Sequence, residues 1–296
     1  MRPAELQALA RSHALLLDGG MGSMLIAAGL DSGRAPEWWT LERPEHVEAV
    51  HRAYVEAGSD VVHTNTFGAN PLRLAAAGLA GRCRELNAAA VAIARRACGE
   101  SALVAGDVGP TGHMLPPVGT ATVDELRAAF AEQVEALVEA GADLISIETM
   151  SDRREALAAV GAATATGLAV HAAMTFEPRR RGVFTIMGDP LVESLLELAA
   201  AGAAAVGCNC SATSPEMLAM VRAAAPRVGV PFSAQPNAGR PRVTPAGVAY
   251  DARPEEFARD LAAMVEAGAA LVGGCCGTTP EFIRCARAAL RQGATP

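Results

Sequence analysis

The segment Ala136-Leu-Val-Glu-Ala-Gly-Ala-Asp-Leu-Ile145 is the most informative about the fold, because its pattern recurs along the chain. Each copy reads as the end of a helix, a glycine, and then a short apolar strand. The other three copies occupy residues 53–62, 198–206 and 263–272. Glycine suits the left-handed residue that ends a helix before a tight turn. The recurrence therefore predicts repeated units in which a helix leads directly into a strand.

Alanine-rich helical segments separate eight short apolar runs, at residues 15–18, 61–66, 103–108, 144–149, 170–176, 204–210, 232–237 and 271–276. Near-continuous apolar strands that alternate with helices are typical of a parallel sheet buried on both faces. Eight such units in about 250 residues predict an α/β fold, the (β/α)8 TIM barrel. No interdomain linker is visible in the sequence, so we expect a single domain over residues 1–296.

Composition limits the classes of function. The chain of 296 residues has a net charge of −7, and nucleic acids or anionic membranes need a basic surface, so neither is expected as a partner. We expect a small-molecule substrate instead. The N-terminal residues do not form a signal peptide and no run is long enough to span a bilayer, which predicts a cytoplasmic protein. All 25 Lys+Arg residues are arginines, which excludes chemistry that needs a lysine amine, such as Schiff-base catalysis.

Three of the seven cysteines lie where apolar runs end: Cys210, Cys275 and Cys276. Cysteines of a reducing compartment are metal ligands or core residues more often than disulfides. Three thiolates at strand ends predict a zinc site with one position left open, as catalytic sites have. Cys275 and Cys276 are adjacent and can share a metal only where the strand gives way to a loop, which Gly277 favours. The alternative is that these thiols are small core residues, which is our interpretation of Cys208.

Active sites of this fold lie at the C-terminal ends of the strands, and polar residues follow several of them. Asp18 and Glu148 suit an ammonium group, although both are also compatible with capping or ion pairing. Gly19 and Gly20 offer backbone N–H groups to a carboxylate. His63 and His171 lie within strands, where hydrogen-bonded core residues are expected rather than ligands; the other polar strand ends are Thr64-Asn65, Asp107, Asn209 and Gln235.

Seven motifs resemble the zinc-dependent homocysteine S-methyltransferases: Leu17-Asp-Gly-Gly-Met-Gly-Ser23, Thr64-Asn-Thr-Phe-Gly-Ala-Asn70, Gly106-Asp-Val-Gly-Pro-Thr-Gly112, Glu148-Thr-Met-Ser-Asp152, Gly207-Cys-Asn-Cys210, Pro236-Asn-Ala-Gly239 and Gly273-Gly-Cys-Cys-Gly-Thr-Thr-Pro280. The order is that of the family, and the likeness is greatest to the homocysteine-binding barrel of cobalamin-dependent methionine synthase, with betaine to homocysteine methyltransferases as near relatives.

The resemblance implies that Cys210, Cys275 and Cys276 hold Zn²⁺, and that a methyl group passes to the thiol of homocysteine to give methionine. It also implies a binding site for the amino acid. Asp18 and Glu148 would bind the ammonium group, and the amides of Gly19 and Gly20 the carboxylate. We expect Thr64, Asn65 and Asn209 to complete the substrate site, and count Glu148 and the three cysteines as the catalytic residues.

The chemistry agrees with this interpretation. A free thiol has a pKa of about 8.5, and only its thiolate attacks a methyl carbon. Zinc coordination removes the proton at neutral pH and fixes the direction of attack, so methyl transfer should be an in-line displacement.

The sequence leaves the methyl donor and the oligomeric state open. Because the chain ends soon after Cys276, we expect either a small onium donor such as glycine betaine or a separate corrinoid protein. Relatives that use S-methylmethionine or S-adenosylmethionine typically have arginine after the cysteine pair, where this chain has Gly277, which disfavours that class of donor. Trp38 and Trp39 could form part of a cage for a quaternary ammonium, or simply cover the mouth of the barrel. A zinc- or thiol-binding barrel without catalytic activity is the competing function.

Overall fold

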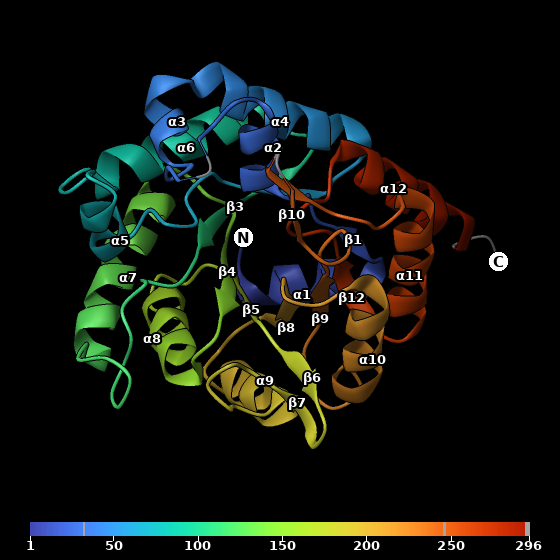
Figure 1. Cartoon of the computed structure of the whole chain (residues 1–296). Coiled ribbons are helices and arrows are strands. Elements are labelled where there is room, and N and C mark those ends of the chain that lie inside the picture. Colours follow the sequence, from blue (N-terminus) through green and yellow to red (C-terminus); the bar gives the residue numbers. More distant parts are fainter. Residues whose placement is uncertain (32, 245–246, 294–296) are drawn as a thin grey trace.

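The computed structural model describes residues 1–31, 33–244 and 247–293. Eight parallel strands form one sheet in the order β1-β12-β9-β8-β5-β4-β3-β2. A parallel bridge between Leu17 and Val61 joins its two edges and closes the barrel, as Figure 1 shows from one end. The strands are β1 (Leu15–Leu16), β2 (Val61–His63), β3 (Leu103–Val108), β4 (Leu144–Met150), β5 (Val170–Met174), β8 (Ala205–Asn209), β9 (Phe232–Gln235) and β12 (Ala269–Val272). Each overlaps one predicted run, and the (β/α)8 prediction is confirmed.

Helices surround the sheet and connect successive strands (Figure 1). Their bounds are α1 (Pro3–Ser12), α2 (Met21–Ala27), α3 (Trp38–Glu42), α4 (Pro44–Ala57), α5 (Pro71–Ala76), α6 (Cys83–Cys98), α7 (Val123–Glu139), α8 (Arg153–Thr164), α9 (Leu191–Ala200), α10 (Ser214–Ala224), α11 (Pro254–Glu266) and α12 (Pro280–Gly293). None of these helices is both long and apolar enough to cross a membrane.

The glycines of the repeated stretch have the expected backbone conformation. The φ angles of Gly58, Gly141, Gly202 and Gly268 are 108°, 91°, 102° and 107°. A side chain would be strained at these angles. Each glycine therefore allows a helix to end and the chain to enter the next strand within a few residues, as the sequence predicts.

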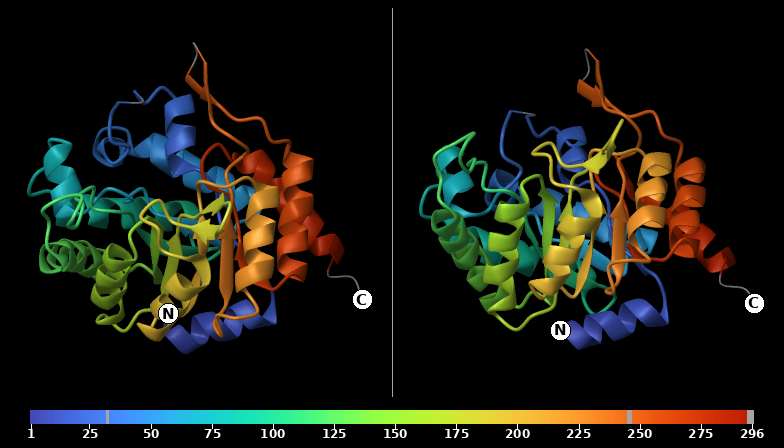
Figure 2. Two further views of the ribbon diagram at one scale, coloured as in Figure 1. Left: turned by 60° about the horizontal axis from the view of Figure 1, so that its bottom comes forward. Right: turned by 90° about the horizontal axis from the view of Figure 1, so that it is seen from below.

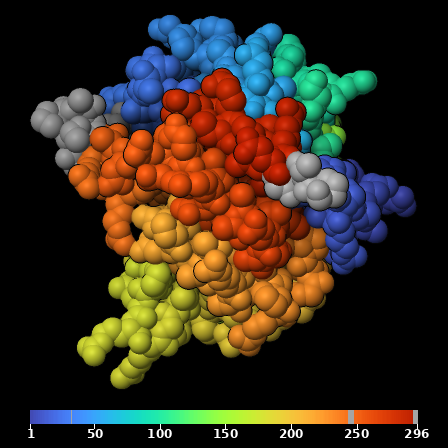
Figure 3. Space-filling view, turned by 90° about the vertical axis from the view of Figure 1, so that its right-hand side faces the viewer, coloured from blue at the N-terminus to red at the C-terminus, as the bar shows by residue number. Residues whose placement is uncertain are grey.

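The two ends of the barrel differ. Helix α1 covers the N-terminal ends of the strands, where Leu6 and Ala10 pack with strand residues such as Leu15 and Leu271. Two antiparallel hairpins project at the opposite end, β6 (Glu177–Arg179) with β7 (Gly182–Phe184) and β10 (Arg242–Thr244) with β11 (Gly247–Ala249), as Figure 2 shows. Figure 3 shows α11 and α12 covering the side of the barrel between these ends. One end is thus sealed by an apolar plug, and the open end carries the loops.

Candidate metal centre and substrate pocket

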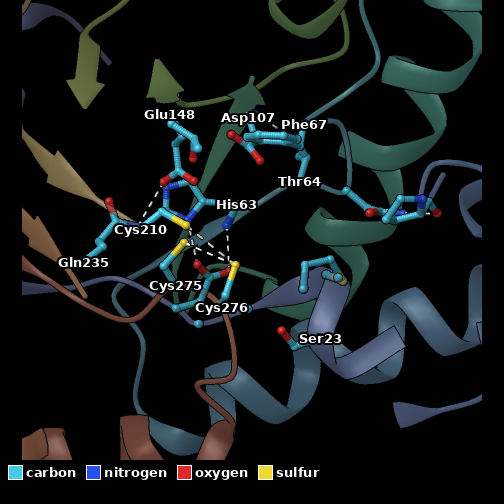
Figure 4. Close-up of a pocket in the computed structure, with 18 of the residues that line it drawn as sticks. Ser23, His63, Thr64, Phe67, Asp107, Glu148, Cys210, Gln235, Cys275 and Cys276 are labelled. Atoms are coloured by element: carbon cyan, nitrogen blue, oxygen red, sulfur yellow. Dashed lines mark hydrogen bonds and ion pairs between the residues drawn. The ribbon is translucent and has the colours of Figure 1, made fainter. Parts of the chain in front are cut away.

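Three sulfur atoms meet at the open end of the barrel (Figure 4). Cys210 follows β8, and Cys275 and Cys276 follow β12. The Sγ atom of Cys276 lies 3.8 Å from that of Cys210 and 4.0 Å from that of Cys275. All three lie within 4.8 Å of one another. Zn–S bonds of about 2.3 Å in a tetrahedron separate the sulfurs by about 3.8 Å, so the cluster has the dimensions of a zinc site with three thiolate ligands.

The backbone around these cysteines is unusual. Cys210 has a φ angle of 56°, in the left-handed region that residues other than glycine rarely adopt. β12 ends at Val272, before the cysteine pair, and Gly277 has a φ angle of 79°. A Cβ atom on Gly277 would lie 2.3 Å from the ring of Tyr250. The pair therefore lies in a tight loop, which allows two adjacent side chains to face the same point.

The sulfur atoms also influence one another electrostatically. The thiols of Cys275 and Cys276 lower the pKa of Cys210 to about 3, which favours a thiolate there. Cys208 differs, because burial in the barrel core raises the pKa of its thiol. Its side chain is fully buried, as the interpretation of Cys208 as a packing residue requires.

The cluster opens into a pocket of about 400 Å³. Four carboxylates and two basic side chains line it, besides the cysteines: Asp18, Glu37, Asp107, Glu148, His63 and Arg73. The lining also includes Gly19, Gly20, Thr64, Asn65, Phe67 and Gln235. The pocket has room for a small amino acid beside the sulfur atoms. Burial raises the pKa of Glu37, Asp107 and Glu148, so a cationic group bound there would stabilise their ionised forms.

His63 lies between two of the carboxylates. Its Nδ1 is 2.6 Å from Oδ1 of Asp18, and its Nε2 is 3.3 Å from Oε1 of Glu148. Burial alone lowers the pKa of His63, but Glu148 and Asp18 raise it, and the result is about 10. His63 is therefore an imidazolium at neutral pH that bridges two strand ends. Gln235 donates a hydrogen bond to Oε1 of Glu148 at 3.0 Å and fixes that carboxylate further.

A chain of hydrogen bonds extends from His63 across the barrel interior. The Nε2 atom of His63 lies 3.1 Å from Oγ of Ser146, which is 2.9 Å from Nδ1 of His171. The Nε2 atom of His171 is in turn 2.6 Å from Oγ of Ser233. Burial lowers the pKa of His171 to about 3, so this ring stays neutral. The prediction that both histidines are hydrogen-bonded within the core is confirmed, but His63 also faces the pocket.

Comparison with known proteins agrees with this geometry. The sequence profile described as homocysteine S-methyltransferase matches residues 15–290. The chain belongs to this family. The methionine synthase of Mycobacterium tuberculosis (strain ATCC 25618 / H37Rv) is 36% identical over 290 residues, which cover 90% of this chain and 24% of the relative. That of Mycobacterium leprae (strain TN) is 34% identical over 93% of this chain and 24% of the relative. The chain thus spans about a quarter of the length of these relatives.

A solved structure of the family has the same fold. The metallated form of the homocysteine methyltransferase MmuM from Escherichia coli superposes with a TM-score of 0.79 at 29% identity. The match covers 96% of this chain and 99% of that one. The name of that structure indicates a metal in a protein of the homocysteine S-methyltransferase family, and the dimensions of the cysteine cluster here fit zinc.

The glycine turn of this family member packs directly against the cysteine loop. A Cβ atom on Gly19 would lie 2.7 Å from Oγ1 of Thr278, and one on Gly20 would lie 2.8 Å from the carbonyl oxygen of Cys275. The amide of Gly20 donates to the carbonyl of Thr278 at 3.2 Å. Of the two amides predicted to bind a carboxylate, that of Gly20 is therefore already used, whereas no acceptor for that of Gly19 is found among the described residues.

Thr64 and Asn65 line the pocket as predicted, but their polar groups bind within the protein. Oγ1 of Thr64 accepts from the amide of Asp107 at 3.0 Å. The side-chain amide of Asn65 donates to the carbonyl of Pro36 at 2.9 Å. Both side chains shape the pocket wall by holding neighbouring loops.

Asn209 differs from the prediction of a substrate-binding residue. It is fully buried and does not belong to the pocket lining. Its Oδ1 accepts from the amide of Thr149 at 2.8 Å, and its Nδ2 donates to Oγ1 of the same residue at 2.8 Å. Thr149 has a φ angle of 60°, so both bonds hold a strained residue next to Glu148. Asn209 thus supports the pocket from behind.

The tryptophan cage is not found either. In the described part of the chain, neither Trp38 nor Trp39 lines the pocket with the cysteines. The guanidinium of Arg34 lies 4.6 Å from the centre of the Trp38 ring, and Trp39 is buried against His46. The aromatic ring in the pocket is Phe67, which had no assigned role. Asp107 and Gln235 were recognised only as polar strand ends, and their side chains enter the pocket as well.

Proposed function

We propose that this chain transfers a methyl group to the thiol of homocysteine and forms methionine, with Zn²⁺ held by Cys210, Cys275 and Cys276. The observation that carries the proposal is that three sulfur atoms, spaced as the ligands of one zinc ion would be, lie in a pocket that is also lined by carboxylates. An amino acid with a thiol in its side chain suits both features, because its thiol can bind zinc and its ammonium group can bind the carboxylates. Bound zinc supplies an ionised substrate sulfur at neutral pH.

The residues of the pocket orient the amino acid. Glu148 receives the ammonium group, because its carboxylate is buried, fixed by Gln235 and close to the sulfur cluster. Asp18 adds negative charge from behind His63. The Gly19 amide, beside the first turn of α2, receives the substrate carboxylate. With both ends of the amino acid held, the sulfur points at the cysteines, and a donor approaches in line from the open side of the pocket.

The donor is a small onium compound such as glycine betaine. The carboxylates of the lining can accept hydrogen bonds from a cation or lie against it, and Phe67 offers an aromatic face, part of which is covered by Arg73 at 5.6 Å. A second candidate is methylcobalamin on a separate protein, favoured by the 36% identity to a methionine synthase of which this chain spans only a part.

The test is a donor comparison with zinc-loaded protein and L-homocysteine. Glycine betaine, a dimethylsulfonio compound, S-methylmethionine and methylcobalamin are each supplied, and methionine is measured by mass spectrometry. Turnover with glycine betaine or the dimethylsulfonio compound supports the proposal in full, whereas turnover with S-methylmethionine alone supports homocysteine methylation with the donor that Gly277 disfavours. Turnover with methylcobalamin alone supports homocysteine methylation with a corrinoid partner. Zinc binding without methionine from any donor would favour the barrel that binds metal without catalysis.

A further inference from the structure

Asp18, the residue that the sequence pairs with Glu148 for the ammonium group, is already committed to another partner. Its Oδ1 lies 2.6 Å from Nδ1 of His63, and its Oδ2 accepts from the backbone amide of His63 at 2.9 Å. Only 1% of the residue is exposed. Each oxygen of Asp18 thus already accepts one hydrogen bond from His63, although a carboxylate has about four acceptor sites in all. Asp18 therefore holds His63 in place, whatever further contact it makes.

Asp107 differs from Asp18 in the hydrogen bonding of its carboxylate. Its backbone is firmly held, because its amide donates to Thr64 and its carbonyl accepts from Oγ1 of Thr66 at 2.7 Å. Its carboxylate, by contrast, is buried, and no described residue donates a hydrogen bond to Oδ1. A buried carboxylate without a partner is costly, and such groups in native proteins call for an explanation. Because Asp107 lines the pocket, the missing partner can be a ligand.

The strand register places Asp107 beside Glu148. Asp107 of β3 lies opposite Ser146 of β4, and Ser146 faces the barrel interior, where it contacts His63. Glu148 is two residues further along β4 and points to the same face. Figure 4 shows both carboxylates next to His63, on neighbouring strands. After burial, the charge of Glu148 is the strongest influence that raises the pKa of Asp107.

We propose that Asp107 is the second carboxylate of the ammonium subsite, so that the homocysteine ammonium lies between Asp107 and Glu148. An ammonium group has three N–H donors and would give Oδ1 of Asp107 the partner that no described residue supplies. It would also separate two carboxylates that otherwise repel each other. The Asp18–His63 pair stays intact in this arrangement. The inference rests on the proposed function, because it assigns the amino group of that substrate.

The experiment measures binding by calorimetry to zinc-loaded wild-type protein and Asp107→Asn. The probes are L-homocysteine and 4-mercaptobutanoate, which keeps the thiol and the carboxylate but has no amino group. We expect Asp107→Asn to weaken homocysteine binding about tenfold or more, the loss of one charge-assisted hydrogen bond, and to change 4-mercaptobutanoate binding less than about twofold. The melting temperature of the variant without ligand should not fall, because the replaced carboxylate makes no hydrogen bond at Oδ1 that the fold would lose.

Glu155→Gln is the matched control. Glu155 is also a buried carboxylate, but it does not line this pocket, and it already accepts a hydrogen bond from the amide of Thr111 at 2.8 Å. Its replacement should leave homocysteine binding within about twofold. Equal homocysteine affinity of Asp107→Asn and wild type, or an equal loss in Glu155→Gln, overturns the assignment of Asp107 while the proposed function stands. Failure of the wild-type protein to bind homocysteine at all overturns the proposed function itself.

Discussion

Replacement of Glu148 by glutamine should weaken homocysteine binding while the metal site is retained. Glu148 is 8% exposed, and its Oε1 accepts from Gln235. Glutamine has nearly the same shape and can still accept that bond through its own carbonyl. What disappears is the negative charge that faces the substrate ammonium. A hydrogen bond to a charged group contributes about 1.5–3 kcal/mol, which corresponds to a roughly 10- to 150-fold increase in Kd.

The substitution has a second consequence at His63. Among the charged neighbours, Glu148 contributes most to the raised pKa of His63. Without that charge the pKa of the imidazole should fall, which an NMR titration of the ring can follow. In the variant, His63 with a lower pKa loses its positive charge at high pH and then repels the substrate ammonium less. The increase in Kd should therefore be nearer tenfold than 150-fold at high pH.

The assay is calorimetric titration of zinc-loaded Glu148→Gln and wild type with L-homocysteine. Metal analysis of the same samples is the control, because Glu148 is not one of the three clustered sulfur residues, and zinc content should be equal. An unchanged Kd would refute the placement of the ammonium at Glu148. Loss of zinc from the variant would show instead that the carboxylate supports the metal centre.

Three further outcomes are expected. Cys210→Ala, Cys275→Ala and Cys276→Ala should each abolish methionine formation and most zinc binding, while circular dichroism shows a retained barrel, since the cysteines lie in loops after the strands; zinc-independent activity would contradict this. Trp38→Phe should leave the donor KM within about twofold, because the ring of Trp38 contacts Arg34 outside the pocket. A large increase in the donor KM would instead support the tryptophan cage. The folded-state pKa of His63 is about 10, above its usual 6.5, so its stabilisation is complete below about pH 6.5 and is lost as pH rises toward 10. Urea unfolding across this range should show a falling free energy of unfolding that His63→Gln flattens, and equal slopes would refute the assignment.

Sequence patterns predict the barrel and the position of the sulfur cluster because both depend on local signals. The glycine after each helix requires a left-handed φ angle, and Gly277 allows the cysteine pair to share a loop. Such preferences belong to single residues and their neighbours. They indicate where strands end, and the fold then brings the ends of parallel strands together.

The hydrogen-bond partners of individual polar groups could not be predicted, because they depend on strand register and on long-range contacts. Nothing local to Asp18 indicates that both its oxygens would be taken by His63, 45 residues away. Asn209 was predicted to bind the substrate, but its side-chain amide donates to Thr149 instead. Thr149 and Cys210, the residue after Asn209, both have left-handed φ angles. Asp107 was visible only as a polar strand end. That its Oδ1 has no hydrogen-bond donor among the described residues becomes apparent once the neighbours on β2 and β4 are placed.

In the proposed mechanism, three cysteines hold zinc and leave its fourth position for the sulfur of homocysteine. X-ray absorption at the zinc edge tests it directly by counting sulfur neighbours before and after L-homocysteine is added. We expect one zinc per chain with three sulfur neighbours and a fourth sulfur neighbour once homocysteine is bound. L-homoserine, which has a hydroxyl in place of the thiol, should cause no such rise. A zinc with four sulfur neighbours from the start, or a count that homocysteine leaves unchanged, would contradict it.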